Sequence, residues 1–252
     1  TKGRPAGLIF RFVLPIVAGN ILQQFYNMVD AVVVGRFVGS RALAAVGATS
    51  TIMFLIIGFM TGMTSGFTVL TSQRFGAGDI KGMKRSVGNG AILSVIITAV
   101  LTVISTLGMR GLLRLMNTPE DIFEDAYRYI WIICVGLWAN TLYNLLASFL
   151  RSVGNSRVPL YFLALSAGCN VVLDLVFVIC FQMGVEGAAW ATVVSQGLSG
   201  LLCLLYIAKA VPLLHPEREH WRLHPGDSRN QILIGIPMAL QFSITAVGTI
   251  IM

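Results

Sequence analysis

Two acidic residues, Asp30 and Asp174, lie inside long runs of apolar residues, where ionisable side chains are rare. An ionisable side chain in such a segment is costly to bury, and it is a candidate functional residue for that reason. Asn170 precedes Asp174 by four residues, so on a helix the amide and the carboxylate can face the same point. Oxygen atoms of carboxylates, amides and hydroxyls are hard ligands that suit Na⁺.

The positions of the candidate groups along the chain predict that they meet. Asp30 lies six residues before Arg36, Thr192 lies six residues after Glu186, and Asp174 lies 12 residues before Glu186. At 1.5 Å per helical residue, these separations put the groups about 9 to 18 Å below one membrane surface. Two carboxylates in a medium of low dielectric resist ionising together, so a proton is as good a candidate ligand as Na⁺. A purely structural polar pair is the alternative.

Other polar residues share faces of the expected helices. At 100° per residue, Gln23 and Asn27 fall on one face of the first apolar segment, and Tyr143 and Asn144 on one face of the fourth. A stripe of Thr and Ser residues runs between positions 61 and 72. Such residues either line a hydrated cavity or hold helices together through modest hydrogen bonds.

These residues belong to a chain too apolar to be a soluble globule. Only 12% of the 252 residues are charged, about half the usual share of about 25%. Charged residues bracket seven apolar segments, each long enough to cross a bilayer. They run from Arg11 to Arg36, Arg41 to Arg74, Arg85 to Arg110, Asp125 to Arg151, Arg157 to Glu186, Glu186 to Lys209, and Arg229 to the end. No stretch alternates as a transmembrane strand would. We therefore predict an all-α polytopic membrane protein.

The basic residues predict an orientation. Of the 18 Lys and Arg residues, 13 lie in the N-terminus and the second, fourth and sixth loops. The positive-inside rule places those parts in the cytoplasm, so we expect a multi-pass protein of the plasma (cytoplasmic) membrane with a cytoplasmic N-terminus. The net charge of +7 follows from these loops and does not indicate nucleic-acid binding.

Residues 210–229 form the one long loop, which contains His215, His220 and His224. Their spacing matches no standard metal site, so we interpret the segment as a solvated linker. No paired catalytic motif and no nucleotide-binding loop occurs, and we expect neither an enzyme nor a resident cofactor.

A short repeat connects the first and last apolar segments. Residues 234–240 (IGIPMAL) align with residues 12–18 (FVLPIVA) at an offset of 222. Six helices would then form one lobe, with the seventh opening a second, parallel copy. We divide the chain into an N-terminal lobe (1–209), a cytoplasmic linker (210–229) and the first helix of a truncated C-terminal lobe (230–252), in which Met252 corresponds to Asp30. We also expect the natural chain to start before Thr1.

Several motifs resemble the multidrug and toxin extrusion (MATE) family. They are LPIVAGNILQQFYNMVDAVVVGRFVGSRALAAVG (14–47), QRFGAGD (73–79), FLRSVGNS (149–156), NVVLD (170–174) and GVEGAAWATVVSQ (184–196). The resemblance covers nearly the whole chain and points to the N-terminal half of that family. It implies one of two six-helix bundles around a central cleft, and twelve helices in all.

The resemblance also implies roles for single residues. Asp30 matches the first-helix aspartate of cation coupling, and Gln23 and Asn144 match positions that contact substrate. Pro15 matches a proline associated with bending, although only four residues separate it from Arg11 and a helix-start proline is the alternative. The partners of Asp30 in the N-terminal lobe match Asn170, Asp174 and Thr192.

The implied activity is export of amphipathic, often cationic, organic compounds in exchange for Na⁺ or H⁺. A flippase for lipid-linked oligosaccharides, from the same wider superfamily, is the alternative. A flippase cavity should hold Arg or Lys to meet phosphates, whereas the sequence offers only Asp at depth. We therefore expect small-molecule organic substrates, with the bilayer and the C-terminal lobe as the other partners.

Overall fold

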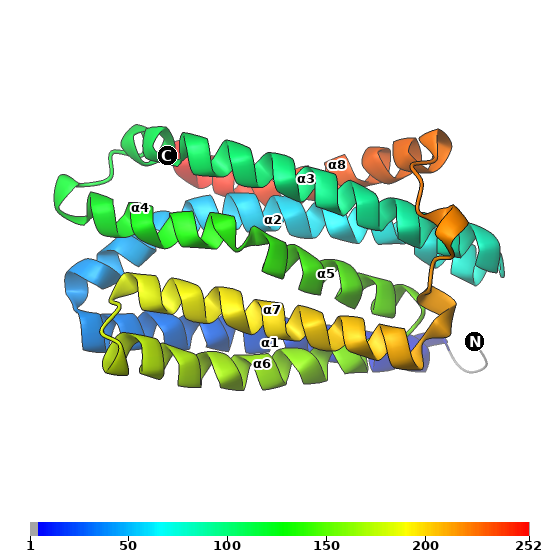
Figure 1. Cartoon of the computed structure of the whole chain (residues 1–252), viewed down its shortest axis with the longest axis horizontal. Coiled ribbons are helices and arrows are strands. Elements are labelled where there is room, and N and C mark those ends of the chain that lie inside the picture. Colours follow the sequence, from blue (N-terminus) through cyan, green and yellow to red (C-terminus); the bar gives the residue numbers. More distant parts are fainter. Residues whose placement is uncertain (1–4, 252) are drawn as a thin grey trace.

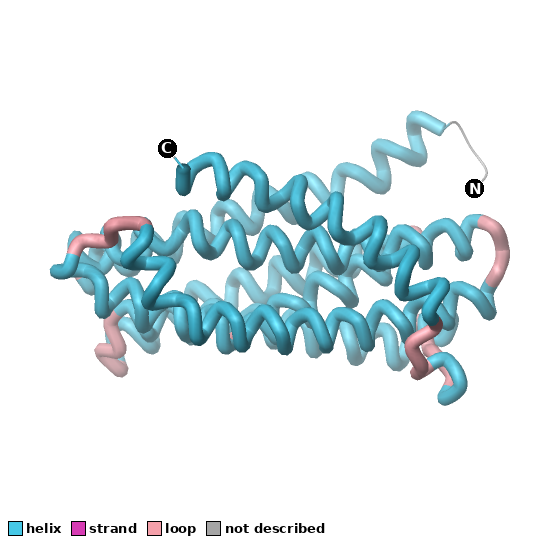
Figure 2. The backbone as a smooth tube through the Cα atoms, turned by 90° about the horizontal axis from the view of Figure 1, so that it is seen from above, coloured by secondary structure: helices cyan, strands magenta, loops and turns pink. Residues whose placement is uncertain are grey.

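The computed structural model is a bundle of long helices with its loops gathered at two ends (Figures 1 and 2). It describes the backbone of residues 5–251 and the side chains of residues 7, 9, 10 and 12–244. The helices are α1 (Pro5–Val33), α2 (Ser40–Gly76), α3 (Ile80–Leu115), α4 (Glu120–Val135), α5 (Leu137–Ser152), α6 (Arg157–Leu175), α7 (Val185–Ala210) and α8 (Pro225–Ile251). Two π-helical segments, η1 (Val34–Val38) and η2 (Val176–Cys180), and two 3₁₀ segments, η3 (Pro212–Leu214) and η4 (Arg218–His220), complete the described part. No strand occurs among residues 5–251, so the all-α prediction is confirmed.

Four of the described helical segments are long and apolar enough to cross a membrane: α2, α3, α6 with η2, and α7. Helices α4 and α5 make a fifth span if they are counted together, although the chain bends by 45° between them. The sequence analysis predicted one span here, between Asp125 and Arg151. The bend lies at Gly136, where a Cβ atom would collide with the side chain of Val193 on α7. Because the glycine has no side chain, α7 can approach α4 and α5 closely at this point.

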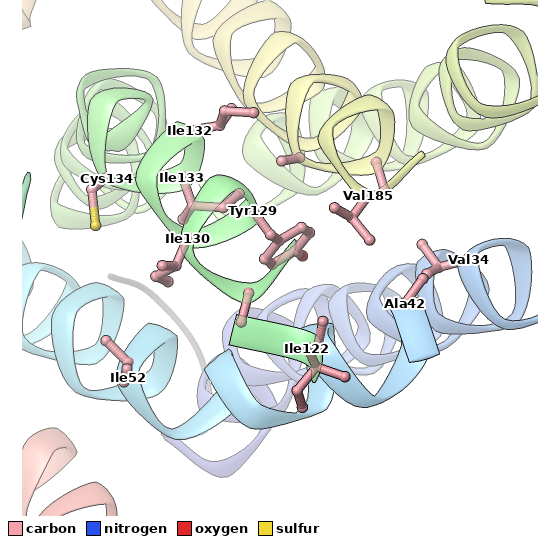
Figure 3. Packing of buried hydrophobic residues seen from close by; sticks show 14 of the residues in the cluster. Val34, Ala42, Ile52, Ile122, Tyr129, Ile130, Ile132, Ile133, Cys134 and Val185 are labelled. Carbon is pink, nitrogen blue, oxygen red and sulfur yellow. The ribbon is translucent and has the colours of Figure 1, made fainter. Parts of the chain in front are cut away.

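Helices α4 and α5 lie between two groups, one of α1, α6 and α7 and one of α2, α3 and α8 (Figure 1). The linker crosses one end of the bundle from α7 to α8, and we call this the linker end. At the opposite end, Ile130 and Tyr129 of α4 pack among Ile52 of α2, Val34 of η1 and Val185 of α7 (Figure 3). This core fixes the ends of α1 and α7 against α4.

Helix α8 lies along α2 at close range because small residues face one another. A Cβ atom on Gly62 would collide with the backbone of Ala239, and one on Gly66 would collide with the backbone of Gly235. Small residues four apart on each helix let two backbones approach within a membrane. The helix that the repeat assigns to the second lobe is therefore packed against the first.

A polar cluster fixes the start of α8 at the linker end. Arg74 binds both carboxylate oxygens of Asp227, at 2.5 and 3.0 Å, and Arg85 donates from Nε to Oδ2 of Asp227 at 2.7 Å. Burial alone would raise the pKa of Asp227, but the hydrogen bonds from the two arginines outweigh it and hold the pKa below its ordinary value.

One turn further along α8, the fully buried Gln231 donates to the carbonyl oxygens of Phe67 and Ser86 and accepts from Asn89. Every polar atom of the Gln231 side chain is therefore paired, as a buried amide requires. We call Arg74, Arg85, Asn89, Asp227 and Gln231 the α8 clamp.

The linker differs from the solvated loop that the sequence predicted. Leu214 and His220 are buried, Lys84 of α3 binds Glu217 at 2.9 Å, and α8 begins at Pro225 instead of residue 230. Two prolines of this segment, Pro212 and Pro225, do not prevent order because they fall at the first positions of η3 and α8, where no intrahelical N–H is needed. The suggested correspondence of Met252 to Asp30 lies outside the described residues.

The α8 clamp predicts a pH-dependent stability. Asp227→Asn should lower the free energy of unfolding by about 2–4 kcal/mol, because it leaves two arginines without their shared carboxylate. Since the folded-state pKa of Asp227 lies below its ordinary value, the ion pairs contribute fully above about pH 4 and are lost as the pH falls further. The difference between wild type and variant should therefore shrink in acid. Thermal unfolding in detergent at several pH values measures this.

The matched control is Glu124→Gln, which removes an exposed partner of Arg110 and Arg128 and should cost less than about 1 kcal/mol. Equal effects of the two substitutions at neutral pH would contradict a stabilising role of the clamp.

Candidate functional site

Asp30 and Asp174 occupy matching positions in their helices. Asp30 lies in the last turn of α1 before η1, and Asp174 in the last turn of α6 before η2. The two π-helical segments contact each other, and α1 packs along α6. A π-helical turn widens the backbone spiral and commonly marks a functional position. The local geometry therefore brings both carboxyl groups to the same place in the bundle.

The four predicted coupling residues do come together. The hydroxyl of Thr192, on α7, donates to Oδ2 of Asp30 at 3.2 Å. The carboxyl groups of Asp30 and Asp174 lie against each other, and the Asn170 amide lies beside Asp30. Asn170 and Asp174 are fully buried, and Asp30 is 7% exposed. Three helices thus direct oxygen ligands to one enclosed point, which we call the acidic site.

Most of the polar atoms of the acidic site have no partner among the described residues. Oδ1 of Asp30, both carboxylate oxygens of Asp174 and both polar atoms of Asn170 are buried without a hydrogen bond. Neither Lys nor Arg reaches the two carboxylates within the described part of the chain. Such a group is expensive to bury unless a cation or a proton joins it, so the donor set fits Na⁺ or a shared proton.

Tyr26 is a residue of this site that the sequence analysis missed. It lies one helical turn before Asp30, is 7% exposed, and its hydroxyl is buried beside Thr192 without a hydrogen-bond partner. The spacing of four residues from Asp30 was the available signal. An aromatic residue in an apolar run is usually part of the hydrophobic core, however. Only the packing of α7 shows that the hydroxyl of Tyr26 faces the acids.

A separate cavity of about 590 Å³ lies between α1, α2, α5 and α6, with Phe242 of α8 also in its lining. Of the residues predicted to face a substrate, Gln23, Tyr143 and Asn144 line this cavity, whereas Asn27 is exposed and lies outside the lining. The side chains of the lining are held in place: Tyr143 donates to the carbonyl oxygen of Pro159, and Asn144 donates to Asn140. We call this the polar cavity.

The polar stripe of α2 divides between the two roles left open by the sequence. Thr61, Ser65, Thr68 and Ser72 line the polar cavity. Thr71 instead pairs its hydroxyl with that of Ser86 on α3 at 3.0 Å, and so joins two helices. Most of the stripe therefore lines the polar cavity, and Thr71 joins α2 to α3.

Pro15 lies in the interior of α1, ten residues after the helix begins, and lines the polar cavity. The alternative of a helix-start proline is thus wrong. Proline has no N–H to donate to the preceding turn, so α1 has a weak point at the cavity. Because Asp30 lies on the same helix, α1 connects the polar cavity with the acidic site.

The expectation that the cavity offers only aspartate, and neither Arg nor Lys, is wrong. Arg151 lines the polar cavity, whereas no acidic residue does. The sequence analysis placed Arg151 at the end of a span, and the structure places it in the last turn of α5, in the lining of the cavity.

The histidines of the linker form no convincing ligand set. Ligand atoms of Glu217, Glu219 and His220 lie within 4.8 Å of one another. However, Nδ1 of His220 accepts from the backbone N–H of Glu217 at 3.0 Å, so a neutral ring carries its proton on Nε2, which faces Glu219 at 3.5 Å. Lys84 already pairs with Glu217. These contacts cap η4 and leave no lone pair of the ring for a metal.

Comparison with known proteins identifies the family. The MatE family profile matches residues 15–176. The probable multidrug resistance protein YpnP of Bacillus subtilis is 32% identical over 250 residues, which cover 98% of this chain and 55% of that protein. The multidrug export protein MepA of Staphylococcus haemolyticus is 24% identical over 95% of this chain and 53% of its own length.

Solved structures of MATE transporters have the same fold as this chain. MATE in the bent conformation superposes with a TM-score of 0.90 at 26% identity, over 98% of this chain and 55% of that one. An outward-facing MATE transporter of the MOP superfamily gives 0.90 at 25% identity over the same shares. The chain spans about half the length of the relatives it matches, as expected for an N-terminal half. These relatives are membrane transporters and not enzymes, and by the profile match and the 32% identity this chain belongs to the MatE family.

Proposed function

We propose that this chain forms the N-terminal lobe of a secondary active exporter that moves amphipathic organic compounds outward while Na⁺ or H⁺ flows inward. The observation that carries the proposal is the acidic site, whose buried carboxyl groups lack partners among the described residues. An enclosed site of this kind stays empty only at a high cost in free energy. Its occupancy is therefore a natural switch between two packings of the helices around it.

Helix α1 couples the occupancy of the acidic site to the shape of the polar cavity. A cation that joins Asp30 to Asp174 and Thr192 pulls the end of α1 onto α6 and α7. Pro15 lies 15 residues earlier, about 22 Å along the helix, at the wall of the polar cavity. A change in the angle of α1 at this proline changes the volume available to a substrate, so ion binding and substrate binding compete through one helix.

The remainder of the mechanism requires a second lobe. In the proposed arrangement, residues 1–209 form one lobe, residues 210–229 a cytoplasmic linker, and α8 opens the other lobe, so that the linker end faces the cytoplasm of a cell with this protein in its plasma membrane. Alternating access follows from rocking of the two lobes about the central cleft. The often cationic substrates that the resemblance implies need a carboxylate from the second lobe, because none lines the described half of the cavity.

Substitution of Asp30 tests the proposal. In the full-length protein, Asp30→Asn should reduce ion-driven export of an ethidium-type dye by about tenfold or more, since it removes a charged ligand of the ion. Dye efflux from proteoliposomes under an imposed Na⁺ or proton gradient measures this. Asp121→Asn changes an exposed acid outside the acidic site and is the matched control. Gradient-dependent efflux that is unchanged in Asp30→Asn would falsify the proposed coupling.

Asp174→Asn gives an independent prediction about stability. In sodium-free buffer the free energy of unfolding of the variant should exceed that of wild type by about 1–3 kcal/mol, because the new amide donates a hydrogen bond to Asp30 without needing a bound proton or cation. Sodium, or acid if the proton is the ligand, should then stabilise wild type but not the variant. Thermal unfolding with and without added Na⁺, and at neutral and acidic pH, shows which ion stabilises wild type. A variant that is less stable than wild type under all conditions would indicate a structural role for the pair.

A further inference from the structure

Arg151 is a charged residue without a charged partner in the described structure. It lies in the last turn of α5, is half-buried, and lines the polar cavity. Its guanidinium donates to the hydroxyl of Ser148 at 3.3 Å and forms no ion pair with any described carboxylate. A guanidinium carries five N–H donors in a planar fork, so most of them remain available.

The polar cavity therefore carries a positive charge where Arg151 lines it. None of the Asp and Glu residues, all of which the structure describes, belongs to its lining, and Arg151 is the one charged residue among the described lining residues. The two buried acids are elsewhere, because neither Asp30 nor Asp174 lines the cavity. A substrate bound in the polar cavity therefore lies beside a cation and beside no acid of the described lining.

The surroundings of Arg151 suit an amphiphile with a small polar head. Hydroxyls of Ser148, Ser152 and Ser156 and the amide of Gln73 lie in the same lining as the guanidinium. The other walls are apolar, with Phe12, Ile16, Leu160, Leu163 and Phe242. A volume of about 590 Å³ falls within the range of about 300–1,000 Å³ that holds a drug-sized molecule.

We propose that Arg151 binds the carboxylate or phosphate group of an amphipathic substrate in the polar cavity, with the apolar part of the substrate against α1, α6 and α8. The inference rests on the proposed export function and assigns an anionic head group to the substrate of this cavity, in place of the often cationic compounds that the resemblance implies. The planar fork of arginine matches two anionic oxygens, so the contact is bidentate and specific for an anionic head. The same contact explains why a charged residue at the end of α5 points into the cavity.

The test compares two probes of one shape, phenylhexanoate and its uncharged phenylhexanamide. The full-length protein is placed in phosphatidylcholine vesicles and the affinity for each probe is measured by competition with a fluorescent substrate. Wild type should bind the carboxylate about tenfold to a hundredfold more tightly than the amide, the range of one charge-assisted hydrogen-bonded pair. Arg151→Gln should bring the ratio close to one and leave the affinity for the amide unchanged.

Two further variants make the result specific. Lys209→Gln removes a positive charge from the last turn of α7 at the same end, outside the cavity, and should keep the wild-type ratio. Arg151→Lys should lower the ratio of the two affinities but keep it above one. If Arg151→Gln does not fold, Arg151→Lys provides the test of the contact. An unchanged ratio in both Arg151 variants, or an equal loss in Lys209→Gln, would overturn the inference.

Transport separates this inference from the proposed function. Gradient-driven export of the amide with no preference for the carboxylate would disprove the role of Arg151 and leave the exporter intact. A carboxylate preference that depends on Arg151, without export of either probe, would support the binding site and disprove the exporter. Competition by phosphatidylglycerol added to the vesicles would assign the anionic head to a lipid, and its absence would assign it to a soluble amphiphile; both support Arg151 as the contact.

Discussion

Two carboxyl groups buried side by side leave a charge in the bundle that no described side chain neutralises. Asp174 is fully buried and Asp30 nearly so, and only one of their four oxygens accepts a hydrogen bond. In a membrane-spanning bundle the penalty for such a pair amounts to several kcal/mol per ion in water-excluded surroundings. The site therefore suits a proton or a cation as a ligand, and in the proposed mechanism the occupancy of the site decides how α1, α6 and α7 pack.

The lobe combines this strained point with rigid surroundings. Helix α8 is fixed to α2 by glycines at close approach and by the α8 clamp at the linker end. By contrast, α1 contacts chiefly α6 and η1, and its other side carries exposed apolar residues such as Phe10, Ile21 and Phe25. A helix with few neighbours and an interior proline moves more readily than one held by a buried polar network. The structure thus separates a helix suited to motion from a scaffold that resists it.

Much of this architecture is predictable from the sequence, for identifiable reasons. The long apolar segments between charged residues predict the helices, because a bilayer tolerates little else. The rarity of acids in those segments singled out Asp30 and Asp174, and helical spacing predicted their convergence with Asn170. The bend at Gly136 depends on the close approach of Val193 on α7, and the place of Arg151 in the cavity depends on how distant helices pack; no local pattern reveals either. The order of the linker depends likewise on charges of α3, distant in sequence, that pair with Glu217 and Asp227.

The central claim is that the acidic site holds either a proton or a cation, and infrared difference spectroscopy tests it most directly. A carboxyl group that carries a proton absorbs at a distinct C=O stretching frequency, separate from that of a carboxylate. The account predicts such a band in sodium-free buffer at neutral pH, absent from the Asp30→Asn, Asp174→Asn double variant and removed by Na⁺ if sodium is the coupling ion. Absence of this band in wild type, together with no spectral change on addition of Na⁺, would contradict the account.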